Sequence, residues 1–428
     1  MNKLLLLWKT KGLRNKILIV LGLLLVTRIL AHVPIPGVNI TLLKNFFEAN
    51  QFLNLLDIFS GGGLSNFSLV MLGVGPYITA SIIMQLLTII VPSLRDLQKE
   101  SGEAGREAIN RYTRYMAVPL TLLQGYATIR LLQTQAGAAT LFGAFTPFQW
   151  FLTLLAITAG SMLLMWIGEI ITEYGIGNGV SLIIFAGIVS QLPASAASLI
   201  SLYDPSKLPI IIGFAIVSLL VIFGVVLVTE AQRNIPVSYA KRVRGDKLFG
   251  GVNTHLPLRL NQGGVIPIIF AISLMIFPTI IAQFFINART EWVAQFAQQV
   301  INLFQNQQTL FYGITYFLLV VIFTYFYATV VFNPEEVAEN VQRNGGFVPG
   351  LRPGKQTADY LFKVLNRITL PGALFLGIIA ILPYILQRIT GVQTLTFGGT
   401  SLLIVVAVVI ETIKQIEAQL TMHDYDNL

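Results

Sequence analysis

Stretches of about twenty apolar residues recur along the chain and are separated by shorter, more polar segments. A helix of about twenty residues, rising roughly 1.5 Å per residue, can cross the roughly 30 Å hydrocarbon core of a bilayer. The pattern therefore predicts ten membrane-spanning helices. Their approximate limits are 17–33, 69–91, 115–132, 148–171, 179–199, 208–228, 263–286, 310–332, 368–386 and 399–416.

The composition agrees with a membrane protein. Of the 428 residues, 54% are hydrophobic and 11% are charged, and the chain contains no cysteine. A soluble domain carries about 25% charged residues. The composition therefore excludes an ordinary soluble enzyme, a disordered protein and a fibrous protein. The missing cysteine excludes disulfides, a thiolate nucleophile and a cysteine-bound metal.

Basic residues lie mainly in every second segment between the predicted spans. They occur in the N-terminal tail and after the second, sixth and eighth spans, whereas the opposite segments hold Lys44, Lys207, Arg289 and Arg388. The positive-inside rule predicts that the basic segments and both termini are cytoplasmic. It does not place the segment after the fourth span, which has no basic residue. We predict a multi-pass protein of the cell inner (plasma) membrane rather than of a thylakoid membrane.

Few charged residues lie inside the predicted spans. Arg28 and Arg130 lie near span ends, and we interpret them as side chains that extend to the headgroup region. Glu169 and Glu411 lie toward the cytoplasmic ends. An ion-coupled transporter is expected to have ionisable groups near the bilayer midplane, so the pattern disfavours this function.

No catalytic or metal-binding motif is present. His32, His255 and His423 lack the spacing of metal ligands, and the chain has no H-E-x-x-H or G-x-S-x-G motif. The glycines at 175, 177 and 179 lack the lysine of a phosphate loop, and we interpret them as a tight connection between two hydrophobic helices. We therefore predict no catalytic residue, no metal, no cofactor and no enzymatic activity.

A glycine-rich segment precedes the second span. Residues 57–85 read DIFSGGGLSNFSLVMLGVGPYITASIIMQ. Each glycine costs up to about 1 kcal/mol in a helix relative to alanine, which predicts a short element and a break before the span. An outer loop would explain the glycines. A re-entrant element also would, because irregular backbone at membrane depth needs protein or a water-filled cavity around it.

Two long polar loops on the basic side, 229–262 and 333–367, carry further basic motifs. The first contains YAKRVRG at 239–245, and the second contains FVPGLRPGKQT at 347–357. These cations either only set the topology or form a docking surface for a large anionic or acidic partner.

Six blocks of the sequence, in order along 17–416, resemble the SecY family of channel subunits of the Sec protein translocase. The blocks are RILAHVPIPGV, FSGGGLSNFS to PYITASIIMQLL, MWIGEIITEYGIGNGVSLIIFAGI, THLPLRLNQGGVIPIIFA, VFNPEEVAENVQRNGGFVPGLRPGKQT and FGGTSLLIVV. The resemblance implies an all-α integral membrane protein with ten transmembrane helices. These would form two pseudo-symmetric five-helix halves, 1–200 and 201–428, which close as a clamshell around an hourglass pore.

The resemblance also implies roles for particular residues. A ring of aliphatic side chains would close the pore: Val74, Ile78, Val180, Ile184, Ile269 and Ile404. A plug helix would close the outer funnel: Phe59, Ser60, Gly61, Gly62, Gly63, Leu64, Ser65 and Asn66. A lateral gate would include Thr79, Gln85 and Phe277. The cytoplasmic loops would contact a motor or the ribosome through Lys241, Arg242, Arg244, Arg352 and Lys355.

The implied function is a passive channel that passes unfolded preproteins across the membrane and releases hydrophobic segments sideways into lipid. The implied partners are SecE-like and SecG-like small membrane subunits, the SecA ATPase, the ribosome, signal sequences, nascent or preprotein chains and the lipid bilayer. Ten spans also fit an inverted-repeat small-molecule secondary transporter. Such a transporter should carry polar or ionisable ligands at the midplane, where the resemblance implies an aliphatic ring.

Overall fold

The computed structural model describes residues 10–36, 38–49, 57, 60–100, 102–135, 146–201, 208–239, 242–244, 247–249, 253–286, 288–306, 309–390 and 400–426. Each of the ten predicted spans overlaps a helix. These helices are α2 (Lys11–Leu30), α5 (Gly75–Ile90), α7 (Gly102–Gln135), α9 (Pro147–Glu173), α10 (Gly179–Ser201), α11 (Leu208–Glu230), α12 (Ile266–Phe285), α14 (Leu310–Val331), α16 (Lys355–Thr390) and α17 (Thr400–Asp426).

Length and composition alone mark five described segments as able to cross a membrane. They are Pro147–Glu173, Ile212–Glu230, Ile266–Phe285, Leu310–Arg343 and Lys355–Arg388. Two shorter apolar helices cover Gly75–Ile90 and Gly179–Pro193. The remaining predicted spans lie on helices that carry more charged and polar residues.

Local sequence explains where several helices begin. Thr146 precedes α9 and accepts a hydrogen bond from the Gln149 backbone N–H, while the Gln149 side chain accepts one from the Thr146 N–H. This reciprocal pair satisfies donors that have no partner within the helix. Helices α5, α9 and α12 also have proline in their first turn, where its missing N–H removes no helical hydrogen bond.

The main hydrophobic core is built by helices from both halves of the chain. Its buried members come from α2, α5, α9, α10, α11, α12, α14, α16 and α17, with a few from the segments between them. Helix α12 packs against α5 and α7, and α10 packs against α2, α9 and α17. Two places therefore join the first five spans to the last five: α12 with α5 and α7, and α17 with α10. The predicted boundary at 200/201 coincides with the end of α10 and stays a prediction.

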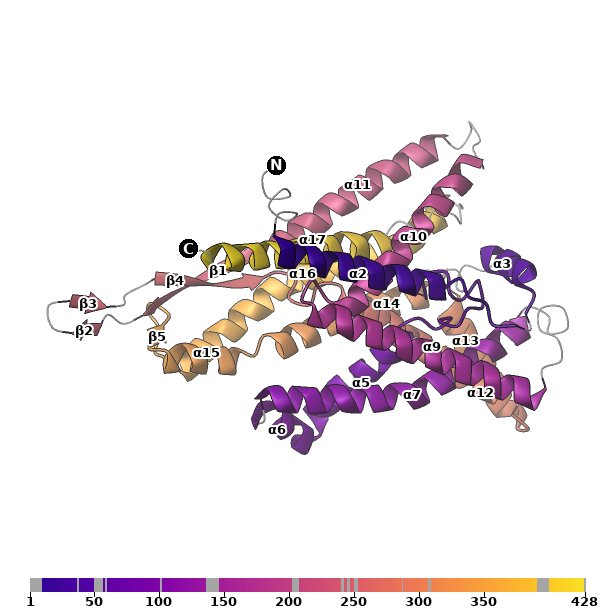
Figure 1. The fold of residues 1–428 in the computed structure, drawn as a ribbon, viewed down its shortest axis with the longest axis horizontal. Coiled ribbons are helices and arrows are strands. Elements are labelled where there is room, and N and C mark those ends of the chain that lie inside the picture. Colours follow the sequence, from indigo (N-terminus) through magenta and orange to yellow (C-terminus); the bar gives the residue numbers. More distant parts are fainter. Residues whose placement is uncertain are drawn as a thin grey trace.

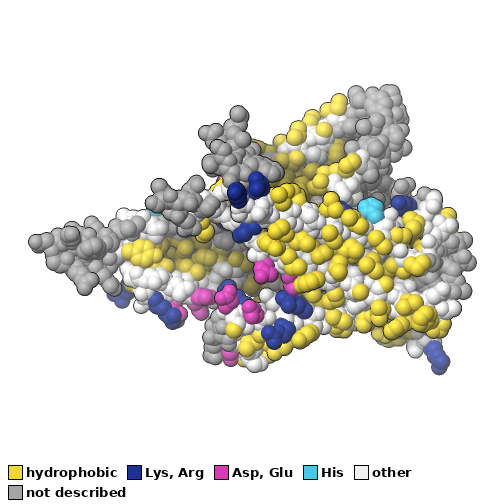
Figure 2. Space-filling model, in the orientation of Figure 1, with side chains coloured by type: hydrophobic (Ala, Val, Ile, Leu, Met, Phe, Trp, Pro, Cys, Tyr) yellow, Lys and Arg dark blue, Asp and Glu magenta, His cyan; other side chains and the backbone are white. Residues whose placement is uncertain are grey.

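The outer surface of the helical body is apolar. Figure 2 shows hydrophobic side chains over much of this face, with most charged side chains toward the end that carries a β-hairpin. Helix α11 contacts α16 and α17, and it exposes large apolar side chains such as Leu219, Leu220 and Phe223. A soluble protein of this size rarely exposes so continuous an apolar surface, so this surface fits lipid or another membrane helix.

The loop after α11 forms a β-hairpin that extends from the helices (Figure 1). Strand β1 (Gln232–Tyr239) pairs antiparallel with β4 (Asn253–Arg259), and β2 (Arg242–Arg244) pairs with β3 (Lys247–Phe249) farther out. Strand β5 (Gly346–Phe347) from the loop after α14 adds to β1, giving the order β4-β1-β5. No strand was predicted, and this small sheet is an addition to a fold that is otherwise helical, as expected.

The sheet and α15 (Pro334–Arg343) share a small hydrophobic core with the start of α16. Ile235, Val237 and Leu258 from the hairpin are buried together with Ala338 and Leu361. This core joins the two long polar loops into one folded unit. In Figure 1, α2 begins and α17 ends toward the same end of the molecule as this unit, which agrees with the predicted sidedness.

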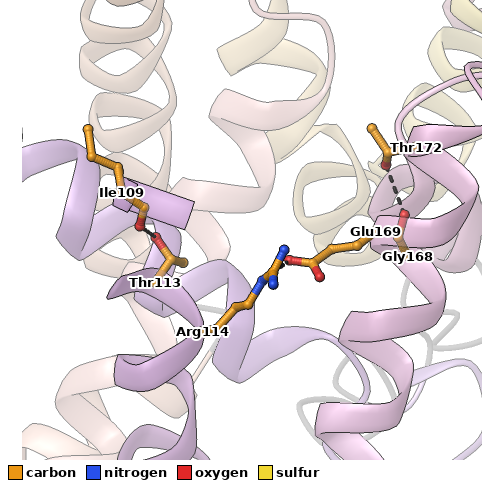
Figure 3. A network of polar contacts seen from close by, with 6 residues as sticks. All are labelled: Ile109, Thr113, Arg114, Gly168, Glu169 and Thr172. Atoms are coloured by element: carbon orange, nitrogen blue, oxygen red, sulfur yellow. Dashed lines mark hydrogen bonds and ion pairs between the residues drawn. The ribbon is translucent and has the colours of Figure 1, made fainter. Parts of the chain in front are cut away.

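The connection from α9 to α10 lies on the same side as the basic segment at the start of α7. Arg114 of α7 and Glu169 of α9 form an ion pair with Nε and Oε1 2.7 Å apart (Figure 3). The Gly179 N–H donates to Thr172 Oγ1 at 2.9 Å, and Gly175 has a φ of +75°. The glycine run is thus the tight connection that was predicted. The ion pair places this connection at the same end of the helices as the basic start of α7.

Among the described residues, three helices besides α15 lie outside the predicted spans. Helix α3 (Ile40–Ala49) follows α2, α6 (Pro92–Glu100) connects α5 to α7, and α13 (Glu291–Gln305) packs against α12 and α14. Helix α13 is amphipathic: Ala297 and Ile301 are buried, whereas Trp292 and Phe296 are exposed.

Candidate pore, plug and lateral gate

A cavity of about 120 Å³ lies between α5, α7, α10 and α12. Four predicted ring residues line it: Val74, Ile78, Ile184 and Ile269. Two predicted plug residues, Ser60 and Leu64, also line it. The structure therefore brings most of the predicted ring and part of the predicted plug to one space at the centre of the molecule.

The six predicted ring residues lie in one hydrophobic cluster. Five are buried and belong to its core, and Val180 packs against this core. Val180 and Ile404 do not line the cavity. Val180 lies against α9, since a Cβ placed on Gly168 would be 3.4 Å from Val180 Cγ2. The cluster agrees with the predicted ring, but Val180 and Ile404 are one layer farther from the open space.

Polar side chains line the cavity where α12 meets α5 and α7. Gln124 of α7 donates through Nε2 to Thr79 Oγ1 of α5 at 3.2 Å, and Thr79 donates to the Gly75 carbonyl at 3.1 Å. On α12, Thr279 Oγ1 and Gln283 Oε1 are buried without a hydrogen-bond partner among the described residues. A buried polar group without a partner costs about 1–3 kcal/mol, so this contact is weaker than an apolar one.

The three predicted gate residues differ in position. Thr79 lines the cavity. Gln85 is on α5, donates through Nε2 to Ser81 Oγ at 3.3 Å and does not line the cavity. Phe277 is half-buried on α12 and also lies outside the lining. Gln124, Thr279 and Gln283 also line the cavity and were not predicted. Their signal in the sequence was a polar residue inside an otherwise apolar span.

Most of the described part of the predicted plug is folded as turns, and Ser60 alone is helical. Residues 61–66 are not helical, so the expected plug helix is wrong for these positions. Gly61 and Gly62 have φ of +68° and +84°, a region that residues with a Cβ rarely adopt. Phe59 lies outside the described residues. The predicted break before the second span is confirmed, because α5 begins at Gly75.

Asp57 and Ser60 fix the turn. Asp57 Oδ1 accepts from the Ser65 backbone N–H at 2.8 Å, and Ser60 Oγ accepts from the Leu64 N–H at 3.0 Å. Burial raises the pKa of the Asp57 carboxyl, and hydrogen bonds from Ser65 and Ser60 act in the opposite direction. The chain also returns to α2 here, because the Leu69 N–H donates to the Val33 carbonyl at 3.1 Å.

Arg28 does not extend to the headgroup region as predicted. Its Nη1 lies 2.7 Å from the Gly61 carbonyl oxygen and 2.7 Å from Ser190 Oγ of α10. Arg130 donates through Nε to Tyr126 Oη at 3.1 Å and lies over the Tyr126 and Trp150 rings. Of the two arginines, Arg28 turns inward to the predicted plug.

The predicted docking residues lie on the folded unit of the two polar loops. Arg352 and Lys355 are exposed, and Lys355 begins α16. Arg242 and Arg244 belong to β2 near the far tip of the hairpin (Figure 1). Lys241 lies outside the described residues.

Comparison with known proteins places the chain in a family. The SecY family model matches residues 68–413. Protein translocase subunit SecY of Mycobacterium tuberculosis is 41% identical over 435 residues, covering 98% of this chain and 97% of that protein. The subunit of the same name from Streptomyces coelicolor is 44% identical over 431 residues, with the same coverage. This chain belongs to the SecY family.

Solved structures show the same fold for the SecY family. A structure of a protein conducting channel has a TM-score of 0.63 at 20% identity and covers 93% of this chain and 90% of its own. Sec61 in the canine ribosome-channel complex from the endoplasmic reticulum has a TM-score of 0.61 at 19% identity, with the same coverage. The chain is a ten-helix membrane clamshell and a protein-conducting channel, so the alternative of a small-molecule transporter is dropped.

Proposed function

We propose that this chain conducts unfolded preproteins through the aliphatic cluster and releases hydrophobic segments where α12 meets α5 and α7. The observation that carries the proposal is the central cavity, because it touches the ring, the plug segment and this contact at once. Its lining contains no ionisable side chain among the described residues. Such a surface can admit varied sequences without binding any of them tightly.

The ring would act as a seal through its lack of polar groups. Branched apolar side chains close around a passing peptide and exclude water when it leaves, which limits ion leakage. The buried Val74, Ile184 and Ile269 supply such a surface, and none of them carries a fixed charge. The glycine-rich turn above them, including Leu64, would complete the closed state.

The lateral gate would lie between α12 on one side and α5 and α7 on the other. This contact contains the Gln124–Thr79 hydrogen bond and the unpaired polar atoms of Thr279 and Gln283. A hydrophobic signal sequence that reaches it is driven into lipid by roughly 25 cal/mol for each Å² of apolar surface removed from water. Weak polar contacts at the opening surface would keep separation of the helices reversible.

We further propose the partners and the location. The exposed Arg352 and Lys355 would bind the SecA ATPase or the ribosome, together with Lys241 and with Arg242 and Arg244 of β2. The apolar faces of α11 and other outer helices would contact lipid and SecE-like and SecG-like subunits. The chain would have no catalytic residue, and SecA, the ribosome or the proton-motive force would supply the energy. It would lie in the cell inner membrane with both termini cytoplasmic.

Site-specific photocrosslinking tests this path. A photoreactive amino acid is placed at Ile78 in the ring or, as a matched control, at Leu219 on the outward face of α11. A preprotein stalled during translocation should crosslink to position 78 and not to position 219. Equal crosslinking at both positions, or crosslinking at position 219 alone, would contradict the proposed path.

A further inference from the structure

Arg28 connects three parts of the protein that are far apart in sequence. It lies in the last turn of α2, and its Nη1 donates to the Gly61 carbonyl of the plug segment and to Ser190 Oγ of α10, both at 2.7 Å. Ionisable side chains within spans are rare and usually have a specific partner. Here the partners are the plug backbone and a hydroxyl, so Arg28 links the plug segment to α10.

The plug and α10 approach closely at this point because both carry glycine. A Cβ on Gly61 would lie 2.9 Å from the Cα of Gly187, closer than real Cβ atoms come to other atoms. Gly61 also has a φ of +68°, in the left-handed region, so the backbone does not continue as a right-handed helix here. Position 61 therefore requires glycine because α10 and Arg28 approach so closely, and not only because a loop needs flexibility.

Two further hydrogen bonds join the plug segment to the same two helices. Asn66 Nδ2 lies 3.3 Å from the Ala31 carbonyl at the end of α2, and Gln191 Nε2 of α10 lies 3.3 Å from the Asp57 carbonyl. The Asp57 carboxyl also interacts electrostatically with Arg28. These contacts all come from α2 and α10, which belong to the first five spans. None comes from α12, on the opposite side of the cavity.

We propose that Arg28 is a positioning residue that clamps the plug to α2 and α10 in the closed channel. The clamp holds the plug against the cavity that the ring lines, through the Gly61 carbonyl, and it leaves the contact of α12 with α5 and α7 free to open. Displacement of the plug requires the guanidinium to release Gly61. Arg28 therefore helps to set the fraction of channels that open without a preprotein. This inference rests on the proposed channel function.

The guanidinium geometry is part of the proposal. Both bonds come from Nη1, whose two N–H groups are fixed in the planar fork of the guanidinium, whereas a lysine is a compact point charge with three donors on a flexible stem. Arg28→Gln removes the charge and the fork, and Arg28→Lys keeps only the charge. We expect plug release to rank Gln above Lys and Lys above the unchanged chain. A role for Arg28 in helix stability alone would not produce this ranking in plug exposure.

The test measures exposure of the plug in the full complex, reconstituted with a SecE-like subunit. Because the chain has no cysteine, Leu64→Cys supplies a single buried thiol on the plug. Its rate of labelling by a membrane-impermeant maleimide is compared with and without Arg28→Gln. We expect labelling to rise about tenfold, the factor expected for loss of a hydrogen bond to a charged group. Arg130→Gln, an arginine that does not contact the plug, should leave the rate unchanged.

A second variant and a translocation assay complete the test. Ser190→Ala removes the α10 acceptor of Arg28, together with the bond that the hydroxyl donates to the Gly187 carbonyl within α10, and leaves the Gly61 contact in place. It should therefore raise labelling by a smaller factor, even if Arg28→Gln does not fold. Translocation of a normal preprotein shows whether each complex is intact. If the intact complex translocates but neither variant changes the labelling, the clamp is wrong. If the unchanged complex does not translocate, the proposed function is wrong instead.

Discussion

At the scale of single residues, the six predicted ring positions are all aliphatic, but only some of them line the cavity. Val74, Ile78, Ile184 and Ile269 line the open space, whereas Val180 and Ile404 support it from behind. The sequence could identify six aliphatic residues only through a resemblance, because an apolar span has no feature that distinguishes a pore-facing isoleucine from a packed one. The orientation of Val180 toward Gly168 depends on how α9 and α10 pack, which is a tertiary property.

This difference predicts unequal effects of a polar substitution. Ile184→Asn places an amide against the cavity, where burial without a partner costs about 1–3 kcal/mol and attracts water. We expect a marked rise in ion leakage and acceptance of preproteins with defective signal sequences. The measurement is conductance of the reconstituted channel without a preprotein.

Val180→Asn is the matched control on the same helix. It disturbs packing against α9 rather than the cavity, so we expect lower thermal stability but a smaller leak. A larger leak from Val180→Asn than from Ile184→Asn would show that the ring is placed incorrectly.

A second residue-scale prediction concerns Thr279. Its buried Oγ1 has no partner among the described residues, so Thr279→Val replaces an unpaired hydroxyl by a methyl group of similar size. We expect the closed complex to become more stable by about 1 kcal/mol. Translocation should then depend more strongly on signal hydrophobicity. Melting temperature and translocation rate together test both effects.

Thr324→Val provides the comparison for Thr279. Thr324 is equally buried on α14, but its Oγ1 donates to the Val320 carbonyl at 2.7 Å. Its replacement should leave stability unchanged or lower it by about 1 kcal/mol, since a formed hydrogen bond is lost. Equal stabilisation by both substitutions would rule out the unpaired Thr279 hydroxyl as the cause.

At the scale of elements, the sequence predicted the spans well and the loops poorly. A span needs only about twenty consecutive apolar residues, a local property, so each predicted span overlaps a helix. The β-sheet depends instead on pairing of segments far apart in sequence, such as Ser238 with Phe347. The alternation of buried Ile235 and Val237 in β1 was the local signal, but eight residues in a polar loop do not show which partner they pair with.

The plug and Arg28 show the same limit. The glycines predicted a break, and the break exists because residues 61–66 form turns. The direction of the Arg28 side chain could not be predicted, because a cation near a span end can reach either the headgroups or the protein interior. The inward direction of the Arg28 side chain is set by the Gly61 carbonyl and Ser190, which are brought together only in the folded chain.

Deleting residues 60–66 tests the plug as an element. The deletion removes Leu64 from the cavity and the carbonyl that Arg28 binds, so the aliphatic ring remains as the only seal. We expect higher ion leakage and acceptance of defective signal sequences, with translocation of normal preproteins retained. If conductance and signal selectivity both stay normal in the deletion variant, these residues are not a plug.

The folded unit of the two polar loops predicts a docking defect without a folding defect. Arg352 is exposed and its carbonyl accepts from Thr357 Oγ1 at 2.9 Å, so the backbone contact does not need the guanidinium. Arg352→Glu should weaken stimulation of the SecA ATPase or ribosome binding while the melting temperature changes little. Lys363→Glu, at an exposed position on α16, is the control. Equal loss in both variants would indicate a general charge effect instead of a docking site at Arg352.

At the scale of the whole molecule, charged and apolar side chains occupy different parts of the surface. Charged side chains gather toward the end with the hairpin, and apolar side chains cover much of the helical body (Figure 2). Inside, the cavity combines aliphatic residues with a few uncharged polar groups. The scarcity of charge that excluded a soluble enzyme is thus also a property of the pore, which has to seal without binding its substrate.

Reconstituted transport tests the central claim most directly. The chain is placed in proteoliposomes with a SecE-like subunit, SecA and ATP, and protection of a secretory preprotein from external protease is measured. We predict protection that requires SecA, ATP and the SecE-like subunit and that stops when a preprotein is jammed in the pore. Efficient transport by this chain alone, or flux of a small solute that a jammed preprotein does not change, would contradict the account.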